Sequence, residues 1–203
     1  GKEVLSDFSL EIRKGEHLAI LGPSGSGKST VLKLLLSLYP IDGGRIVLVF
    51  ENHIRELRKQ DRNLFGYVPQ ENLVLPSTIR DMVTFFDDDV DEERLKDAYR
   101  ISGCDDFIRS LPDKDKTMLK EKGTNLSLGQ LQRLSIARAI YSDGPILLLD
   151  EITSALDRGC SRKIMENLKK EKKTIFLVTH HDEELSEDMH RIEIGETTWN
   201  RDR

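Results

Sequence analysis

The chain has 203 residues, which is enough for one substantial α/β core with a subdomain. Its composition, 37% hydrophobic and 33% charged, is typical of a folded globular protein and excludes a disordered one. The formal net charge of −5, with lysines and arginines scattered among the acids, provides no basic surface for nucleic acid, so no nucleic-acid partner is expected.

Membrane and secretion signals are also missing from the sequence. No apolar run exceeds about six residues, whereas a membrane-spanning helix needs about 20. No secretory signal peptide is recognisable, and because residue 1 is glycine, we expect the chain to be a piece of a longer one. Cys104 and Cys160 are too few for a disulfide framework or a zinc site. Cys160 shares an i, i+4 row with Ile164 and Leu168, which predicts a reduced thiol on a buried helix face.

Strand and helix patterns alternate along the chain. The strands are predicted from short apolar runs beside glycine or proline turns, at His17–Leu21, Arg45–Phe50, Phe65–Val68, Pro145–Leu149 and Thr174–Val178. A leucine- and valine-rich helix is predicted over Ser29–Leu38, because no breaker occurs before Pro40. Near-continuous apolar strands are typical of parallel sheets that are covered on both faces, so the prediction is an α/β fold.

Residues from about 71 to 136 have a different pattern. Helices are predicted at Asp91–Ile101 and Cys104–Leu111, and strand signals are few, which indicates a helical insertion between two parts of the α/β core. The acidic run Asp87–Glu93 resembles a calcium loop, but such a loop needs glycine at its sixth position and glutamate at its twelfth. Those positions hold Glu92 and Ala98, so the run is interpreted as the solvated start of a helix.

A glycine-rich loop lies between the first predicted strand and the first predicted helix. It matches the P-loop pattern G-x-x-x-x-G-K-[ST] in the required context. Backbone N–H groups of such a loop wrap phosphates, Lys28 is expected to reach the β- and γ-phosphates, and the Ser29 hydroxyl is expected to ligate Mg²⁺. The nucleotide-binding residues predicted here are Gly22, Pro23, Ser24, Gly25, Ser26, Gly27, Lys28, Ser29 and Thr30.

Two carboxylates follow the strand that ends near Leu149. Asp150 is expected to meet Mg²⁺ opposite Ser29, and Glu151 is expected to polarise the attacking water as a general base. The alternative interpretation is an acidic strand end that caps the next helix, since acids favour helix N-termini. The P-loop in the same chain favours the first interpretation.

Two further residues follow predicted strands. His180 comes directly after Thr179 at the end of the last strand, where parallel sheets bind their ligands, so it is expected to contact a γ-phosphate. Gln70 follows the strand that contains Tyr67 and Val68, and it is expected to contact metal or water.

A second phosphate-seeking helix start occurs at Leu126–Gln130. This glycine- and hydroxyl-bearing turn opens a helical stretch that extends to Tyr141. A helix N-terminus presents unpaired N–H groups and the positive end of the macrodipole, so it attracts anions. The chain therefore carries two such starts, one with a lysine and one without.

Taken in order, these motifs resemble the nucleotide-binding domain of an ATP-binding cassette (ABC) transporter, over nearly the whole chain. The resemblance implies a P-loop NTPase of the ABC ATPase type, with a RecA-like core, an antiparallel β subdomain and a helical subdomain. It implies a single domain over residues 1–203, with the core at about 1–70 and 137–203 and the helical subdomain at about 71–136. ATP and Mg²⁺ are the implied cofactors, with ATP hydrolysed.

The resemblance also assigns roles to residues. Glu151, His180, Lys28 and Gln70 are implied to be catalytic, and Ser29, Gln70 and Asp150 to hold the metal. Residues Ser127 to Gln130 match the signature motif, and Ser154 to Asp157 match the D-loop. The nucleotide contacts implied outside the P-loop are Gln70, Ser127, Gly129, Gln130 and Asp157.

The family pairs two such domains head to tail, so that each nucleotide lies between one P-loop and the partner's signature motif. The implied partners are therefore a second nucleotide-binding domain, identical or different, and a transmembrane domain. The implied location is the cytoplasmic face of a membrane. This arrangement explains why one chain has two phosphate-seeking helix starts: they bind the same γ-phosphate on different subunits.

Several details refine the resemblance. Thr78–Met82 and Thr117–Gly123 look like exporter segments, although Leu119 and Lys120 depart from the usual valine and glycine. Leu128 occupies a signature position where glycine is commonest, which we expect the site to tolerate. The family's adenine-stacking aromatic would lie before Gly1.

The sequence disfavours two alternative functions. A soluble ABC-type ATPase of chromosome maintenance or translation is disfavoured, because only about a hundred residues separate P-loop from signature and one cassette is present. A nucleotide-binding module with little turnover is disfavoured because Lys28, Glu151 and His180 are all retained.

Overall fold

The computed structural model describes residues 4–180, 185 and 189–194. The ends of the predicted domain, residues 1–3 and 195–203, therefore lie outside the described residues.

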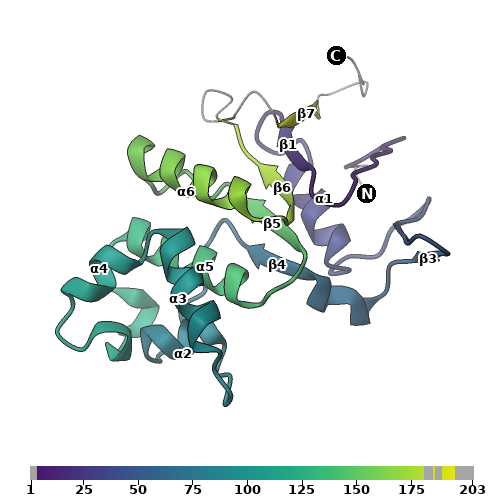
Figure 1. Cartoon of the computed structure of the whole chain (residues 1–203). Coiled ribbons are helices and arrows are strands. Elements are labelled where there is room, and N and C mark those ends of the chain that lie inside the picture. Colours follow the sequence, from purple (N-terminus) through teal and green to yellow (C-terminus); the bar gives the residue numbers. More distant parts are fainter. Residues whose placement is uncertain (1–3, 181–184, 186–188, 195–203) are drawn as a thin grey trace.

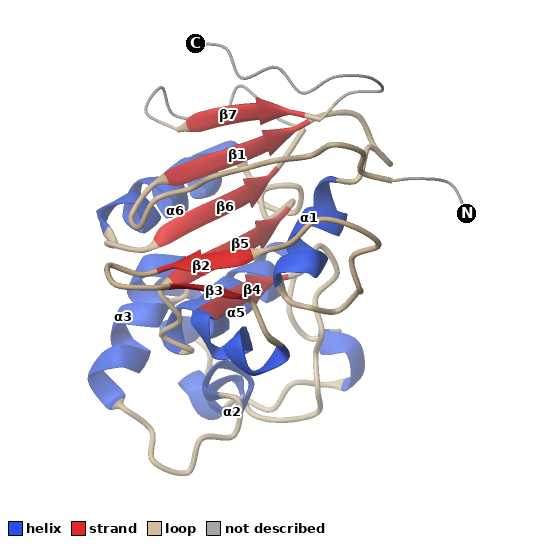
Figure 2. Cartoon of the chain, turned by 90° about the vertical axis from the view of Figure 1, so that its right-hand side faces the viewer, coloured by secondary structure: helices blue, strands red, loops and turns tan. Residues whose placement is uncertain are grey.

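The centre of the fold is a five-stranded parallel sheet (Figures 1 and 2). Its order is β4-β5-β6-β1-β7, with β1 at His17–Leu21, β4 at Phe65–Val68, β5 at Ile146–Asp150, β6 at Thr174–Val178 and β7 at His190–Glu193. Because all five strands point the same way, their carboxyl ends meet at one edge, which is where open α/β sheets bind ligands.

Strands β1, β5 and β6 are buried on both faces of the sheet, which explains their uninterrupted apolar sequences. On one face, α1 (Lys28–Leu35) packs on alternate residues such as Leu148 and Phe176. On the other, α5 (Leu128–Tyr141) and α6 (Arg158–Lys170) pack on Leu147 and Leu149 (Figure 1). Each fully buried leucine contributes about 1.5–3 kcal/mol to stability, so a strand buried on both faces is held strongly in place.

A group of helices lies between β4 and β5 in the chain. They are α2 (Ile79–Thr84), α3 (Glu92–Ser102) and α4 (Asp105–Ser110), together with the start of α5 (Figure 1). Single 3₁₀ turns occur in this group at η2 (Lys114–Lys116) and η3 (Glu121–Gly123), and a longer 3₁₀ segment, η1 (Lys59–Leu64), precedes β4. Helix α3 buries Leu95, Ala98 and Tyr99 on one face, and it packs against α5.

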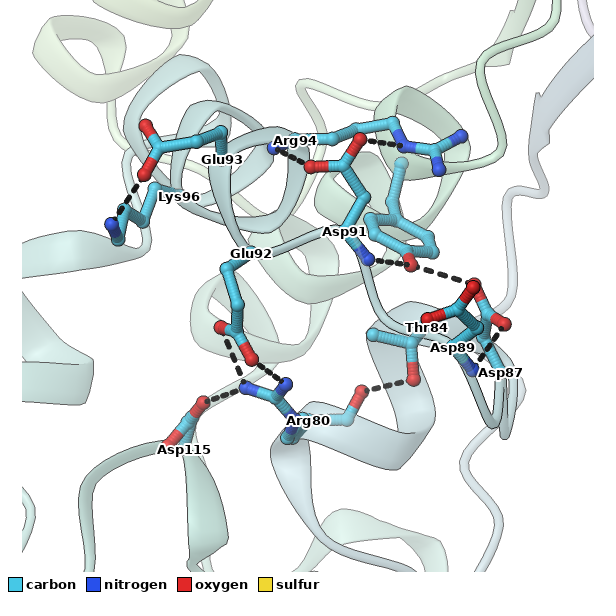
Figure 3. A network of polar contacts seen from close by, with 11 residues as sticks. Arg80, Thr84, Asp87, Asp89, Asp91, Glu92, Glu93, Arg94, Lys96 and Asp115 are labelled. Atoms are coloured by element: carbon cyan, nitrogen blue, oxygen red, sulfur yellow. Dashed lines mark hydrogen bonds and ion pairs between the residues drawn. The ribbon is translucent and has the colours of Figure 1, made fainter.

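Polar contacts tie these helices to one another (Figure 3). The guanidinium of Arg80 on α2 pairs with Glu92 at the start of α3 and, at 3.4 Å, with Asp115 of η2. The Tyr141 hydroxyl at the end of α5 donates to Asp87 at 2.7 Å and accepts the Asp91 N–H at 3.2 Å. The loop between α2 and α3 is therefore held against the end of α5.

The acidic run within this network forms a helix start, as predicted. Asp91 is the N-cap of α3, and its carboxylate accepts the backbone N–H of Arg94 at 3.0 Å (Figure 3). Across the described ranges, no group of three or more His, Cys, Asp or Glu side chains could hold a metal ion. The calcium-loop interpretation therefore has no support among those residues.

Two predicted elements are shorter in the structure. Helix α1 ends at Leu35 rather than Leu38, because Ser37 adopts a left-handed φ of 50° and Arg62 bonds the carbonyls of Leu36 and Ser37. The strand predicted at Arg45–Phe50 is β2, Val47–Val49, which pairs antiparallel with β3, Ile54–Glu56. This pair is the small antiparallel sheet of the fold.

Two remaining expectations concern the cysteines and membrane spanning. Cys104 is buried and Cys160 is half-buried against the core beside Ile164 and Leu168; both thiols are free, as predicted. Burial raises the pKa of the Cys104 thiol to about 12. None of the described helices has the length and apolar composition needed to cross a bilayer.

Candidate nucleotide-binding and hydrolytic site

The P-loop is a turn that only glycine permits at its key positions. It leaves the end of β1 and enters α1, with positive φ angles at Gly22, Gly25 and Gly27 of 145°, 80° and 96°. A Cβ atom on Gly22 would lie 2.3 Å from the carbonyl oxygen of Ile194, so a larger residue does not fit. Glycine thus serves both the backbone conformation and the close approach of the strand β7 end.

The inside of this loop suits a phosphate chain. The Lys28 ammonium is buried and donates to the carbonyl oxygens of Gly22 and Pro23, each at 2.8 Å. Among the described residues, no side chain forms a capping hydrogen bond at the N-terminus of α1, so its first-turn N–H groups are available to an anion. The Ser26 hydroxyl oxygen is buried without a hydrogen-bond partner in the described structure. A phosphate oxygen would satisfy these donors.

Asp150 lies at the carboxyl end of β5, beside the first turn of α1. Its Oδ1 accepts the Ser29 hydroxyl at 2.8 Å, and the Tyr67 hydroxyl lies 3.5 Å from Oδ2. Only 2% of Asp150 is exposed, and burial raises the pKa of its carboxyl group, against the opposing effect of the Ser29 hydrogen bond. Burial, with the charge of Asp150, also raises the pKa of Tyr67 to about 12.

Glu151 is held at both carboxylate oxygens. The Gln70 amide donates to Oε2 at 2.6 Å, and His180 Nδ1 lies 3.1 Å from Oε1. Its backbone has a left-handed φ of 52°, which costs roughly 1–3 kcal/mol in a non-glycine residue. The Glu151 N–H donates to Val178 and the Ser154 hydroxyl donates to the Glu151 carbonyl, which hold this backbone in place. Strain at an acidic strand end is typical of a functional site.

The predicted residues of the P-loop, Gln70, Asp150, Glu151 and His180 are thus brought to one edge of the sheet. A hydroxyl and a carboxylate oxygen lie together at Ser29 and Asp150, which is the oxygen-rich donor set that Mg²⁺ prefers, with phosphate oxygens expected to complete it. The Gln70 side chain contacts Glu151 rather than Asp150, so its predicted metal contact stays a prediction.

The predicted signature motif forms a second, separate helix start. Ser127 is the N-cap of α5: its Oγ accepts the Gln130 N–H at 3.2 Å, while its own N–H donates to Gln130 Oε1 at 2.8 Å. The Leu128 side chain is 71% exposed. Over the part of the chain that the structure describes, no hydrogen bond or ion pair links Ser127–Gln130 to the P-loop. The two predicted halves of the nucleotide site therefore do not meet within one chain.

The predicted D-loop, Ser154 to Asp157, lies against the N-terminus of α5. A Cβ on Gly129 would lie 2.9 Å from the carbonyl oxygen of Ala155, so the two segments approach closely only because residue 129 is glycine. Asp157 caps α6 by accepting the Cys160 N–H at 2.9 Å. Its predicted role at the nucleotide stays a prediction.

Three contacts at this edge were not anticipated from the sequence. The hydroxyl of Tyr67 faces Asp150, the hydroxyl of Ser154 supports Glu151, and Asn72 binds α5. Tyr67 could have been found from the strand pattern, because β4 and β5 are neighbours with parallel ends. Asn72 carries no signal in the sequence, since its partners lie 60 or more residues away.

This arrangement defines a P-loop protein with the paired carboxylates Asp150 and Glu151 at the carboxyl edge of its sheet. The sequence profile of the ABC transporter family matches residues 5–154. The chain therefore belongs to the ABC transporter family, and its fold is that of the family's ATPase domain.

Individual relatives agree with this assignment. ATP-binding cassette sub-family B member 5 from Homo sapiens is 40% identical over 181 residues, covering 88% of this chain and 14% of that protein. Leukotoxin translocation ATP-binding protein LktB from Mannheimia haemolytica is 38% identical over 181 residues, covering 87% of this chain and 25% of LktB. ABC transporter B family member 6 from Dictyostelium discoideum is 36% identical over 180 residues, covering 88% and 26%. The chain thus spans about a quarter or less of these relatives.

A solved structure is also similar over nearly the whole chain. A bacterial Atm1-family ABC exporter with ATP bound has a TM-score of 0.86 and 29% sequence identity, covering 95% of this chain and 34% of that one.

Proposed function

We propose that this chain is the ATP-hydrolysing engine of an ABC exporter, and that head-to-tail dimerisation driven by ATP powers transport. The observation that carries the proposal is the convergence of the P-loop, the Ser29–Asp150 pair and the Gln70–Glu151–His180 cluster at one sheet edge. The proposed unit is one nucleotide-binding domain, with its core at about residues 1–70 and 137–203 and a helical subdomain at about 71–136.

The P-loop side of the site binds the nucleotide. Lys28 would exchange its bonds to the loop carbonyls for bonds to the β- and γ-phosphates, beside the free N–H groups of α1. Ser29, Asp150 and Gln70 would hold Mg²⁺, which neutralises charge that develops on the phosphates during transfer. Burial raises the pKa of Asp150, so a Mg²⁺ ion bound beside it would favour the charged carboxylate and relieve the cost of its burial.

The hydrolytic step rests on Glu151. Gln70 and His180 each contact a different oxygen of Glu151 and so fix the direction of the carboxylate. A fixed carboxylate beside the γ-phosphate orients a water molecule for in-line attack and accepts its proton. In this proposal His180, which lies at the same edge, would bind the γ-phosphate as well.

A second copy supplies the other half of each site. Ser127 and Leu128 are exposed, and the first-turn amides of α5 face no capping side chain other than the Ser127–Gln130 pair. Ser127, Gly129 and Gln130, with Asp157 from the adjoining loop, would therefore complete the partner's nucleotide site. A two-fold axis then gives two sites per dimer.

A transmembrane partner is proposed from the apolar residues around α2. Leu75 and Met118 are 41% and 58% exposed beside its start, where residues 77–79 pair with residues 117–119. Phe85 and Phe86 are 67% and 52% exposed directly after its end, both at left-handed φ angles. Exposed apolar groups gathered around one short helix are typical of an interface. This docking would place the chain on the cytoplasmic face of a membrane.

The experiment that tests this function is the variant Glu151→Gln. Loss of the general base is expected to lower turnover by roughly 10²- to 10⁴-fold while nucleotide binding persists. Phosphate release measures turnover, and sizing chromatography with ATP is expected to show a dimer that accumulates. The matched control is Glu166→Gln, an exposed position on α6, which is expected to leave both unchanged. Hydrolysis by Glu151→Gln at the wild-type rate would refute the assignment.

A further inference from the structure

Asn72, two residues after Gln70, makes an unusual set of contacts with α5. Its Nδ2 donates to Gln132 Oε1 at 3.0 Å, and its Oδ1 accepts the Ser135 hydroxyl at 2.6 Å. The next carbonyl in the chain, that of Leu73, lies 3.4 Å from a guanidinium nitrogen of Arg138. The three α5 residues are spaced i, i+3, i+6 and so form one polar stripe, which binds two consecutive residues of the loop.

This stripe is not explained by stability alone. Gln132 is 1% exposed and Ser135 is fully buried, yet Gln132 Nε2 has no hydrogen-bond partner in the described structure. A buried donor without a partner is destabilising, so removing this amide offsets the loss of the bond between Gln132 and Asn72. The polar groups therefore serve another purpose than holding the core together.

The position of the stripe indicates that purpose. At its upstream end, the loop carries Gln70, whose amide binds the Glu151 carboxylate. At the N-terminus of α5 is Ser127, five residues before Gln132 and therefore about 7.5 Å along the same helix. The stripe thus connects Gln70, which binds the proposed base Glu151 of one site, to the N-terminus of α5, which completes the other site in the proposed dimer.

We propose that Asn72 is a positioning residue for ATP hydrolysis, which clamps the segment after Gln70 to α5 and so holds Gln70 against Glu151. The inference rests on the proposed function, and it adds a residue outside the nucleotide's own contacts. When the clamp is closed, Gln70 and the signature helix start move as one body. When it is open, Gln70 is free to leave Glu151.

Four variants test the clamp. Asn72→Ala removes both of its bonds, and Gln132→Met removes one bond together with the unpartnered amide. Asn72→Asp is the conservative rescue, because its carboxylate can accept both the Ser135 hydroxyl and the Gln132 amide. The matched control is Asn167→Ala, which removes a side-chain bond of 3.2 Å to the Ile101 carbonyl, away from Gln70.

The expected results separate positioning from stability. For Asn72→Ala and Gln132→Met, kcat is expected to fall about fivefold to tenfold with KM for ATP within twofold of wild type, as when one or two ordinary hydrogen bonds no longer hold Gln70. Gln132→Met is expected to keep the wild-type melting temperature or exceed it. Asn72→Asp is expected to regain most of kcat, and Asn167→Ala to keep it.

A second measurement does not depend on turnover. Amide hydrogen exchange over residues 70–75 is expected to speed up in Asn72→Ala and not in Asn167→Ala, because the loop has lost its anchor. Unchanged exchange there, wild-type kcat in both clamp variants, or an Asn72→Asp variant as slow as Asn72→Ala would each overturn the clamp. Failure of the proposed function is recognised separately, as equal hydrolysis by wild type and Glu151→Gln.

Discussion

The buried carboxylate of Asp150, whose charge serves the proposed function, is expected to lower the stability of the folded protein. Its carboxylate is buried, and its pKa is raised mainly by that burial, so the folded state holds its proton more tightly than the unfolded state does. At any pH where the carboxylate is ionised in both states, folding carries the cost of desolvating the charge. The variant Asp150→Asn keeps the shape and removes the charge.

The magnitude follows from the contacts. The asparagine oxygen can still accept the Ser29 hydroxyl, which now lies 2.8 Å from Oδ1, and its amide can donate to the Tyr67 hydroxyl oxygen. The Tyr67 hydroxyl then gives up only the long 3.5 Å bond that it donates to Oδ2. We expect the variant to be more stable than wild type by about 1 kcal/mol at pH 7.5, or about 2–4 °C in melting temperature for a chain of this size. Turnover should be lost, because the proposed Mg²⁺ site loses its charged ligand.

The sign of the pH dependence is fixed by the raised pKa. Between the ordinary Asp pKa and the raised folded value, the folded protein binds more protons than the unfolded one, so wild-type stability falls as pH rises through this window. The advantage of Asp150→Asn should therefore be largest above the folded pKa and shrink as pH falls toward about 4. Thermal unfolding of both proteins at pH 7.5, 5.5 and 4 measures it. A variant less stable than wild type at pH 7.5 would refute the reasoning.

Two further predictions concern the fold. Gly66→Ala would place a Cβ 2.3 Å from the Ala139 carbonyl oxygen and 2.8 Å from a Leu147 methyl, which would force β4 away from α5. We expect the free energy of unfolding, measured with denaturant, to fall by about 2–3 kcal/mol, whereas wild-type stability would show that the two elements separate easily. Asp61→Asn tests the ion pair with Arg55, which lowers the pKa of Asp61 to about 2, so the stability that the pair contributes is present above the ordinary Asp pKa and is lost as pH falls toward about 2. The stabilities of wild type and variant should therefore differ at pH 7 and converge at pH 2, and an equal difference at both pH values would contradict the ion pair.

Much of the site was predictable because its residues follow buried strands. Ser29, Asp150 and His180 each sit directly after or beside a strand end, and parallel strands bring their ends to one edge. The P-loop was predictable because its glycines are required by the positive φ angles of the turn itself. The same locality explains why the start of α3 at Asp91 was predicted from sequence alone.

The remainder depends on contacts between distant residues. Helix α1 ends early because Arg62, 26 residues from Leu36, binds its last carbonyls. Asn72 meets α5 across 60 residues or more, and Gly129 owes its identity to a carbonyl of Ala155. Local periodicity contains none of this information, since each contact exists only after the helices pack.

The most direct test of the composite site is a mixing experiment. Lys28→Ala disables the P-loop half, and Ser127→Arg disables the signature half by adding bulk at an exposed helix start. Ser127→Ala, which loses the same N-cap hydrogen bond, is the stability control. Lys28→Ala and Ser127→Arg should each be inactive alone. A mixed dimer of the two contains one site with an intact P-loop from one chain and an intact signature motif from the other. Phosphate release from the mixture should therefore exceed the sum of the separate variants, and a mixture no more active than that sum would contradict the account.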